Sequence, residues 1–125
     1  MLSTTITDVR AVAIGVRDQQ TAVRFYVDIL GFEKRRDAQI SPQMRWIEVA
    51  PHGATTSLAL TLTDQPTGET DTGIRYVVPD ADAEHAAMRE RGVDVGEMIR
   101  WEGVPPMYSF DDPDGNRFYI VEESP

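Results

Sequence analysis

The sequence predicts an α+β fold built from two tandem β-α-β-β-β modules. The first observation is a repeat, because Val16-Arg17-Asp18 and Val78-Pro79-Asp80 each end a short apolar strand and begin a helical stretch. The second observation is that each helical stretch is followed by a glycine, Gly31 or Gly92, and then by another strand. Recurrence of these pieces in register is the pattern of a duplicated supersecondary unit.

The length of the chain favours one domain that contains both modules. With 125 residues, the chain falls at a common domain size and can bury a core without disulfides. We expect a single domain over residues 1–125, with module one at about 1–63, a linker at 64–72 and module two at about 73–125.

The first module is predicted to contain four strands and one helix. In its first strand, apolar bulky residues alternate with Ala11, Ala13 and Gly15, as in a strand with one buried face. Its helix has apolar residues at spacings of three and four, and Gly31 suits the end of that helix. In order, the expected elements are Val9–Val16, the helix Gln20–Leu30, Phe32–Arg36, Met44–Ala50 and Ser57–Thr63.

The second module repeats this order after a linker that lacks large apolar residues. Asp80 or Asp82 can cap the start of its helix, and Asp111 to Asn116 has the composition of a tight turn. In order, the expected elements are Gly73–Val78, a helix at about Asp82–Arg91, Asp94–Arg100, Met107–Asp111 and Arg117–Glu122.

Composition limits the partners of the chain. The formal charge of −9 and the pI near 4.5 argue against nucleic acid, because binding to phosphates requires clustered Lys and Arg. No apolar stretch is long enough to span a membrane, and the N-terminus does not have the pattern of a signal peptide. The chain has no cysteine, so we expect a cytoplasmic protein without disulfides or thiolate metal sites.

These features resemble those of the vicinal oxygen chelate superfamily, which includes glyoxalase I, bleomycin-resistance proteins and extradiol dioxygenases. The resemblance rests on several short motifs that together span nearly the whole chain. They are Val16-x-Asp18, Ala22-x-x-x-Tyr26-x-x-x-Leu30-Gly31-Phe32, Arg45 to Pro51, Arg91-Gly92-Val93 and Asp112-Pro113-Asp114-Gly115-Asn116. The resemblance implies a mixed sheet curled around a cleft, with the helices outside, and a homodimer.

The resemblance also implies where a divalent metal ion would be held in metalloenzymes of this superfamily. The corresponding positions are Ala11, Gly73, Tyr119 and, in a less certain register, Leu60. None of these side chains is a usual ligand, since neutral imidazole and carboxylate groups are the usual ones. We therefore expect no metal site and no cofactor, and no catalytic residue is assigned.

The remaining cleft candidates are mostly aromatic. We expect substrate-binding side chains from Trp46, Glu48, Arg75, Trp101, Tyr108 and Tyr119. Apolar walls with few polar anchors are typical of sites for organic ligands. Each aromatic residue alone is equally compatible with the core or a dimer interface, and the loop around Trp101 with either a pocket lid or a dimer contact. Glu48 is compatible with binding a cation or with a salt bridge to Arg45 or Arg75.

Three functions agree with these observations. The leading hypothesis is a metal-free, homodimeric protein that binds a small organic ligand without transforming it, and the acidic composition favours a cationic ligand. The alternative is a metal-dependent lyase or isomerase of the glyoxalase type with atypical ligands. The third is a scaffold whose cleft is filled by its own side chains.

Overall fold

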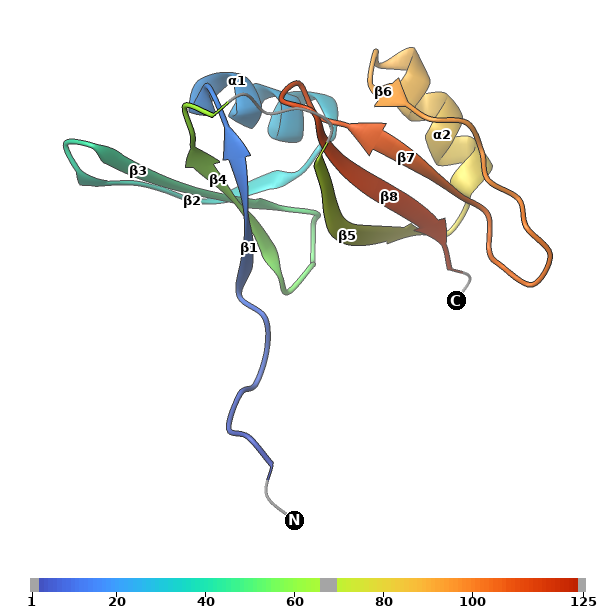
Figure 1. Ribbon diagram of the computed structural model, residues 1–125, viewed down its shortest axis with the longest axis horizontal. Coiled ribbons are helices and arrows are strands. Elements are labelled where there is room, and N and C mark those ends of the chain that lie inside the picture. Colours follow the sequence, from blue (N-terminus) through green and yellow to red (C-terminus); the bar gives the residue numbers. More distant parts are fainter. Residues whose placement is uncertain (1–2, 66–69, 124–125) are drawn as a thin grey trace. The chain divides into compact units, whose positions relative to one another are not determined.

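A computed structural model describes residues 3–65 and 70–123 and has the predicted element order (Figure 1). The sequence β-α-β-β-β occurs twice, in two four-stranded mixed sheets, which confirms the α+β fold class. The chain divides into two compact units. The first comprises the residues up to Ile14 together with Asp18–Leu62, and the second comprises Gly15–Arg17 and the residues from Thr63 onward. The expectation of one domain stays a prediction.

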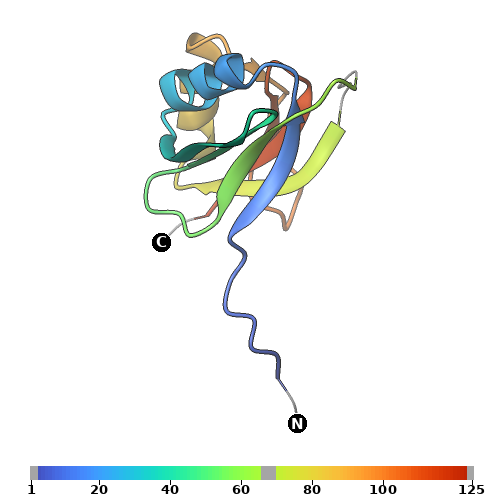
Figure 2. The same ribbon diagram turned by 90° about the vertical axis from the view of Figure 1, so that its left-hand side faces the viewer.

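The first sheet has the strand order β1-β4-β3-β2. Figure 2 shows β1 in blue alongside β4 in green. Antiparallel pairing joins β2 to β3 and β3 to β4, and the β3 strand has the predicted bounds. The strands are β1 (Ala11–Val16), β2 (Glu33–Ser41), β3 (Met44–Ala50) and β4 (Ser57–Leu62). The β2 strand extends five residues beyond the expected Arg36 because it forms a long hairpin with β3.

The helical part of the first unit has nearly the expected extent, but it changes from an α-helix to a π-helix. Helix α1 (Gln19–Val23) begins at Asp18, whose carboxylate accepts a hydrogen bond of 2.9 Å from the Thr21 backbone nitrogen. A π-helical segment, η1 (Arg24–Ile29), then follows. The Leu30 nitrogen donates to the Phe25 oxygen, five residues back, over 3.0 Å. The wider turn agrees with the burial of two consecutive aromatic residues, Phe25 and Tyr26, whose rings meet edge to face.

The second sheet has the strand order β5-β8-β7-β6, with β5 parallel to β8 and the other pairs antiparallel. Its elements are β5 (Thr70–Val78), helix α2 (Ala81–Glu90), β6 (Asp94–Val95), β7 (Met107–Asp111) and β8 (Asn116–Glu122). The Asp80 carboxylate caps α2 by accepting from the Ala83 nitrogen over 3.1 Å, so Asp80 is the capping residue of the two that were expected.

Two parts of the second module differ from expectation. Strand β5 begins at Thr70, inside the stretch expected to be a linker, and residues 66–69 of that stretch lie outside the described residues. Strand β6 ends at Val95 rather than near Arg100. The Gly96 nitrogen still donates to the Ser109 oxygen of β7 at 2.8 Å, and Ile99 and Met107 form a further isolated bridge.

Each sheet buries one face beneath its own helix. In the first unit the buried strand residues include Ile47, Val49, Leu58 and Leu60. In the second unit they are Tyr108, Phe110, Phe118 and Ile120, and Tyr108 contacts Met88 and His85 of α2. We call the opposite side of each sheet its helix-free face. No helix in the described ranges 3–65 and 70–123 is long and apolar enough to cross a membrane.

Candidate functional site

The helix-free face of the first sheet carries Trp46 and Glu48. They alternate along β3 with the buried residues Ile47 and Val49, because successive strand side chains point to opposite faces. Glu48 is paired with Ala59 on β4, so a small side chain lies beside the carboxylate. Strand parity therefore places these two predicted site residues on one surface.

Glu48 is a buried carboxylate held by three donors. It is 4% exposed, and its Oε2 accepts hydrogen bonds from the Trp46 indole Nε1 at 2.7 Å and from the Arg10 guanidinium at 3.4 Å. The indole bond is the main cause that lowers the pKa of Glu48; burial opposes it, while Arg10 and the Ser57 hydroxyl add to it. Glu48 therefore remains an anion at neutral pH.

The expected salt bridge of Glu48 with Arg45 or Arg75 is wrong. Arg45 instead forms a bidentate pair with Asp37, with both donor–acceptor distances at 2.8 Å, and lowers the pKa of that carboxyl far below its usual range. Arg45 and Trp46 are consecutive on β3, so their side chains point to opposite faces of the sheet. Arg45 therefore forms its ion pair with Asp37 of the neighbouring strand β2, within the hairpin. Arg10, which precedes β1, takes the place beside Glu48.

The helix-free face of the second sheet has three rows of side chains, set by the strand register. At one end lie Val77, Val121 and Met107, which are all apolar. The middle row contains Arg75, Tyr119 and Ser109, and the third row contains Asp71, Arg117 and Asp111. The surface therefore changes from apolar to charged over three rows.

Arg75 and Tyr119 form the centre of this face. The guanidinium carbon of Arg75 lies 4.4 Å from the centroid of the Tyr119 ring, within the range of a cation–π contact. The side chain of Arg75 is 48% exposed, and its ion pair with Asp71 spans 3.6 Å, which is longer than a hydrogen bond. The structure brings these two predicted site residues into direct contact.

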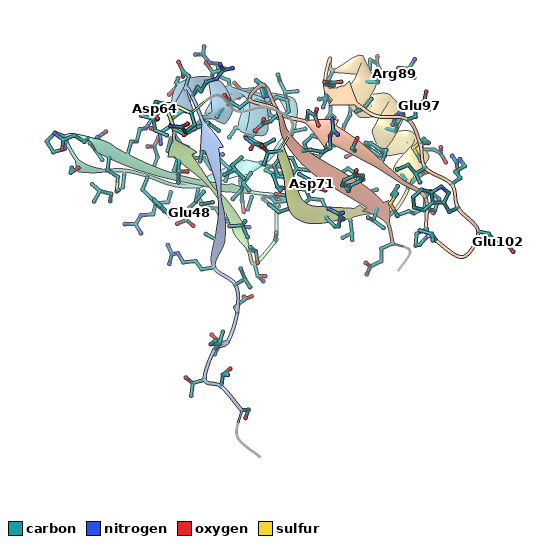
Figure 3. The ribbon with its side chains drawn as sticks, viewed as in Figure 1. Glu48, Asp64, Asp71, Arg89, Glu97 and Glu102 are labelled. Atoms are coloured by element: carbon teal, nitrogen blue, oxygen red, sulfur yellow. The ribbon has the colours of Figure 1, made fainter. Side chains whose placement is uncertain are left out.

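The remaining two predicted residues lie elsewhere in the second unit. Tyr108 is 0% exposed and donates a hydrogen bond of 3.3 Å to the Met88 sulfur, so it belongs to the core beneath α2 and not to the face that carries Tyr119. Burial raises its pKa well above the ordinary value. Trp101 is 65% exposed in the loop between β6 and β7, next to Glu102, which Figure 3 shows at the tip of that loop.

The positions at which the superfamily resemblance implies metal ligands do not fit a divalent ion. Ala11 and Gly73 have no donor atom in their side chains, and Leu60 is buried in the core. The Tyr119 ring is in contact with a cation, Arg75. Within residues 3–65 and 70–123, no three His, Asp or Glu side chains are grouped in a way that could hold a metal.

In two polar clusters, the long-range partners were not predicted from the sequence. Arg10 and Ser57 hold Glu48, but they are 38 and 9 residues from it and belong to no local motif. The Asp112 to Asn116 turn was recognised as a turn, and it is one. Its long-range partners, Gly15 and Arg17, give no signal in a single sequence.

The fold and these surfaces agree with a family assignment made from the whole chain. A sequence profile of the Glyoxalase/Bleomycin resistance protein/Dioxygenase superfamily matches residues 9–120, and the chain belongs to this superfamily. The match covers both β-α-β-β-β modules, except for the end of the last strand.

Three relatives are similar to this chain over nearly its whole length. A member of the superfamily from Sphaerobacter thermophilus DSM 20745 is 38% identical, with a TM-score of 0.89, covering 96% of this chain and 100% of that chain. TnmS3, an antibiotic binding protein from Streptomyces sp. CB03234, is 35% identical, with a TM-score of 0.85, covering 98% and 100%. The uncharacterized protein YetH of Bacillus subtilis (strain 168) is 32% identical over 120 residues, covering 94% of this chain and 99% of YetH.

Proposed function

We propose that this chain binds a small organic molecule on the helix-free face of a sheet and does so without a metal ion. The observation that carries the proposal is the Arg75–Tyr119 contact, which occupies a position where the superfamily resemblance implies a metal ligand. An aromatic ring and a guanidinium offer stacking and hydrogen bonding to an organic ligand. The proposed contact residues are Trp46, Glu48, Arg75, Trp101 and Tyr119.

The similarity to TnmS3 supports binding rather than conversion of a ligand. TnmS3 is described as an antibiotic binding protein, and the present chain is 35% identical to it over nearly its whole length. Glu48, the one carboxylate on the helix-free face of β3, already accepts hydrogen bonds from Trp46 and Arg10. Those bonds stabilise its charged form and make it a weak proton acceptor.

The decisive experiment combines metal analysis with ligand screening. Protein purified without chelator is analysed for zinc, nickel, manganese and iron, and the same sample is screened against small organic compounds by thermal shift. We expect less than stoichiometric metal and at least one compound that raises the melting temperature. Stoichiometric metal that is lost in Glu48→Gln would instead support the glyoxalase-type lyase or isomerase.

We also propose that the protein is a homodimer. The support is the exposure of large apolar side chains that are not proposed ligand contacts, among them Ile40 and Met44 on the hairpin of β2 and β3. Exposed apolar surface favours contact with another chain. Sedimentation velocity at several protein concentrations tests this, and a single monomeric species would contradict it. The cytoplasmic location expected from the sequence stays a prediction.

A further inference from the structure

The donor groups of Arg75 indicate the charge of the ligand. Within the described residues 3–65 and 70–123, the Arg75 guanidinium donates no hydrogen bond to another residue, and its contact with Asp71 at 3.6 Å is an exposed ion pair. Exposed ion pairs contribute little to the stability of a protein, so a ligand can replace Asp71 beside Arg75 at low cost. A guanidinium presents a planar fork of N–H donors that matches the two oxygens of a carboxylate.

Tyr119 adds to this donor group. Its ring lies against the Arg75 guanidinium, which limits the directions in which that side chain can point. Its hydroxyl also makes no hydrogen bond within the part of the chain that the structure describes. A phenol hydroxyl can donate to a carboxylate oxygen. Arg75 and Tyr119 together therefore offer two kinds of donor on one surface.

An apolar surface continues from this donor group along the strands. Val77 and Val121 lie two residues beyond Arg75 and Tyr119 on the same faces of β5 and β8, and Met107 is opposite Val121. Two residues along a strand span about 7 Å. Val77 is 60% exposed, so this row is accessible to a ligand. A molecule with a carboxylate at one end and a hydrocarbon part at the other matches the two rows.

We infer that the second sheet binds a carboxylic acid with a hydrocarbon part, with its carboxylate on Arg75 and Tyr119 and its hydrocarbon part along Val77, Val121 and Met107. The inference rests on the proposed function and specifies its ligand class. The inferred ligand is an anion, whereas the net charge of −9 favours a cationic ligand. The local donor groups decide between them, because the ligand contacts these groups directly. Most of the acidic surplus lies outside the two rows that form this site.

Three probes that share a naphthyl ring and carry an anionic, a neutral or a cationic group test this inference. They are 2-naphthoate, its neutral analogue 2-naphthamide and the cation 2-naphthylmethylammonium, each titrated into the full chain by isothermal calorimetry. We expect 2-naphthoate to bind at least about tenfold more tightly than the amide, because hydrogen bonds between a guanidinium and a carboxylate are roughly twice as strong as those to a neutral acceptor. The cation should bind least tightly.

Variants assign the effect to these residues. Arg75→Met should remove the preference for 2-naphthoate over 2-naphthamide, and Arg75→Lys should retain only part of it because an ammonium lacks the planar fork. Val77→Ser should weaken the binding of 2-naphthoate more than the binding of benzoate, because benzoate has less hydrocarbon to contact the apolar row that contains Val77. Arg89→Met is the matched control, since Arg89 is an exposed arginine on α2 (Figure 3), and it should leave all affinities unchanged. Circular dichroism confirms that each variant is folded.

The outcomes separate this inference from the proposed function. Tighter binding of the cation, or unchanged 2-naphthoate affinity in Arg75→Met, would overturn the assignment of a carboxylic acid while ligand binding itself stands. Binding of other screened compounds but none of the naphthyl probes would also overturn it. If no organic compound stabilises the protein, both the inference and the proposed function fail.

Discussion

Asp114 and Arg17, which are 97 residues apart, are joined by two hydrogen bonds: the Asp114 Oδ1 accepts from the Arg17 backbone nitrogen at 3.1 Å and from its Nε at 3.3 Å. Asn116 extends this connection, because its Nδ2 donates to the Gly15 oxygen at 2.9 Å. Asp112 holds the turn itself by accepting from the backbone nitrogens of Asp114 and Asn116. The turn between β7 and β8 thus fixes residues 15–17 within the second unit.

Removing the Asp114 carboxylate should lower the free energy of unfolding. In Asp114→Ala the Arg17 backbone N–H loses its acceptor in a part-buried place, and such a loss costs about 1–3 kcal/mol. Arg17→Ala should cost less, because it removes only the Nε donor. Urea denaturation measures both, and Asp64→Ala, which changes an exposed aspartate, is the control. Equal stability of Asp114→Ala and the wild type would contradict this role.

Glu48 should make the stability depend on acidic pH. The Trp46 hydrogen bond lowers its pKa in the folded state below the ordinary value of 4.5, so the unfolded chain binds this proton more readily. The contribution of Glu48 to the free energy of unfolding is therefore present above about pH 4.5. It disappears as the pH falls through the lowered pKa of the folded state. Glu48→Gln should be less stable than the wild type at neutral pH, and the difference should shrink in acid. Glu102→Gln, at an exposed loop position, is the control and should be as stable as the wild type at neutral pH.

Tyr76 should make the stability depend on alkaline pH. Burial raises its pKa from 10.0 to about 12, so the folded protein keeps a proton that the unfolded chain loses. The free energy of unfolding should therefore fall as the pH rises from 10.0 toward about 12. Tyr76→Phe keeps the ring that stacks on Phe118 but cannot ionise, so its decline should be smaller. Denaturation curves at two alkaline pH values measure the decline for the wild type and for Tyr76→Phe. An equal decline in the two proteins would contradict this role of Tyr76.

Trp101 should report whether its loop is a lid or a dimer contact. Because Trp101 is 65% exposed, acrylamide should quench its fluorescence strongly, and Trp101→Phe should remove most of the quenchable emission. Protection that appears on adding a ligand would indicate a lid. Protection that rises with protein concentration would indicate a dimer contact. Quenching that survives in Trp101→Phe would show that Trp46 is the exposed fluorophore.

Ligand binding should not require a metal ion. Dialysis against EDTA is expected to leave both the melting temperature and the affinity for any ligand found by screening unchanged, because Ala11, Gly73 and Tyr119 offer no usual ligand set. Adding zinc or nickel after dialysis serves as the control. A loss of affinity that returns with one of these metals would contradict metal-free binding.

The element order could be predicted from the sequence because local patterns specify it. Alternation of apolar residues predicted β3 and β7 with the observed bounds, and the acidic residue after each first strand is the N-cap of the following helix. The start of β5 and the end of β6 could not be read this way. Those bounds depend on pairing with β8 and β7, which are distant in sequence.

The candidate site was predictable in part. Parity placed Arg75 and Tyr119 on one face, and the structure brings them into contact. Parity could not assign Tyr108, because alternation gives two faces for β7 and only the contact with Met88 shows which one is covered by the helix. Arg10 and Ser57 could not be predicted as partners of Glu48, since the pairing of three strands decides their positions.

The assignment of Gly15–Arg17 to the second unit has a consequence for experiments that divide this gene. A cut near residue 64 separates the two repeats in sequence, but it removes the segment that Asp114 and Asn116 hold. Halves produced from such a cut should therefore regain structure only when co-expressed, as a split-protein pair. A circular permutant opened at the same place keeps the segment and should fold as one chain, provided that a linker joins the original ends.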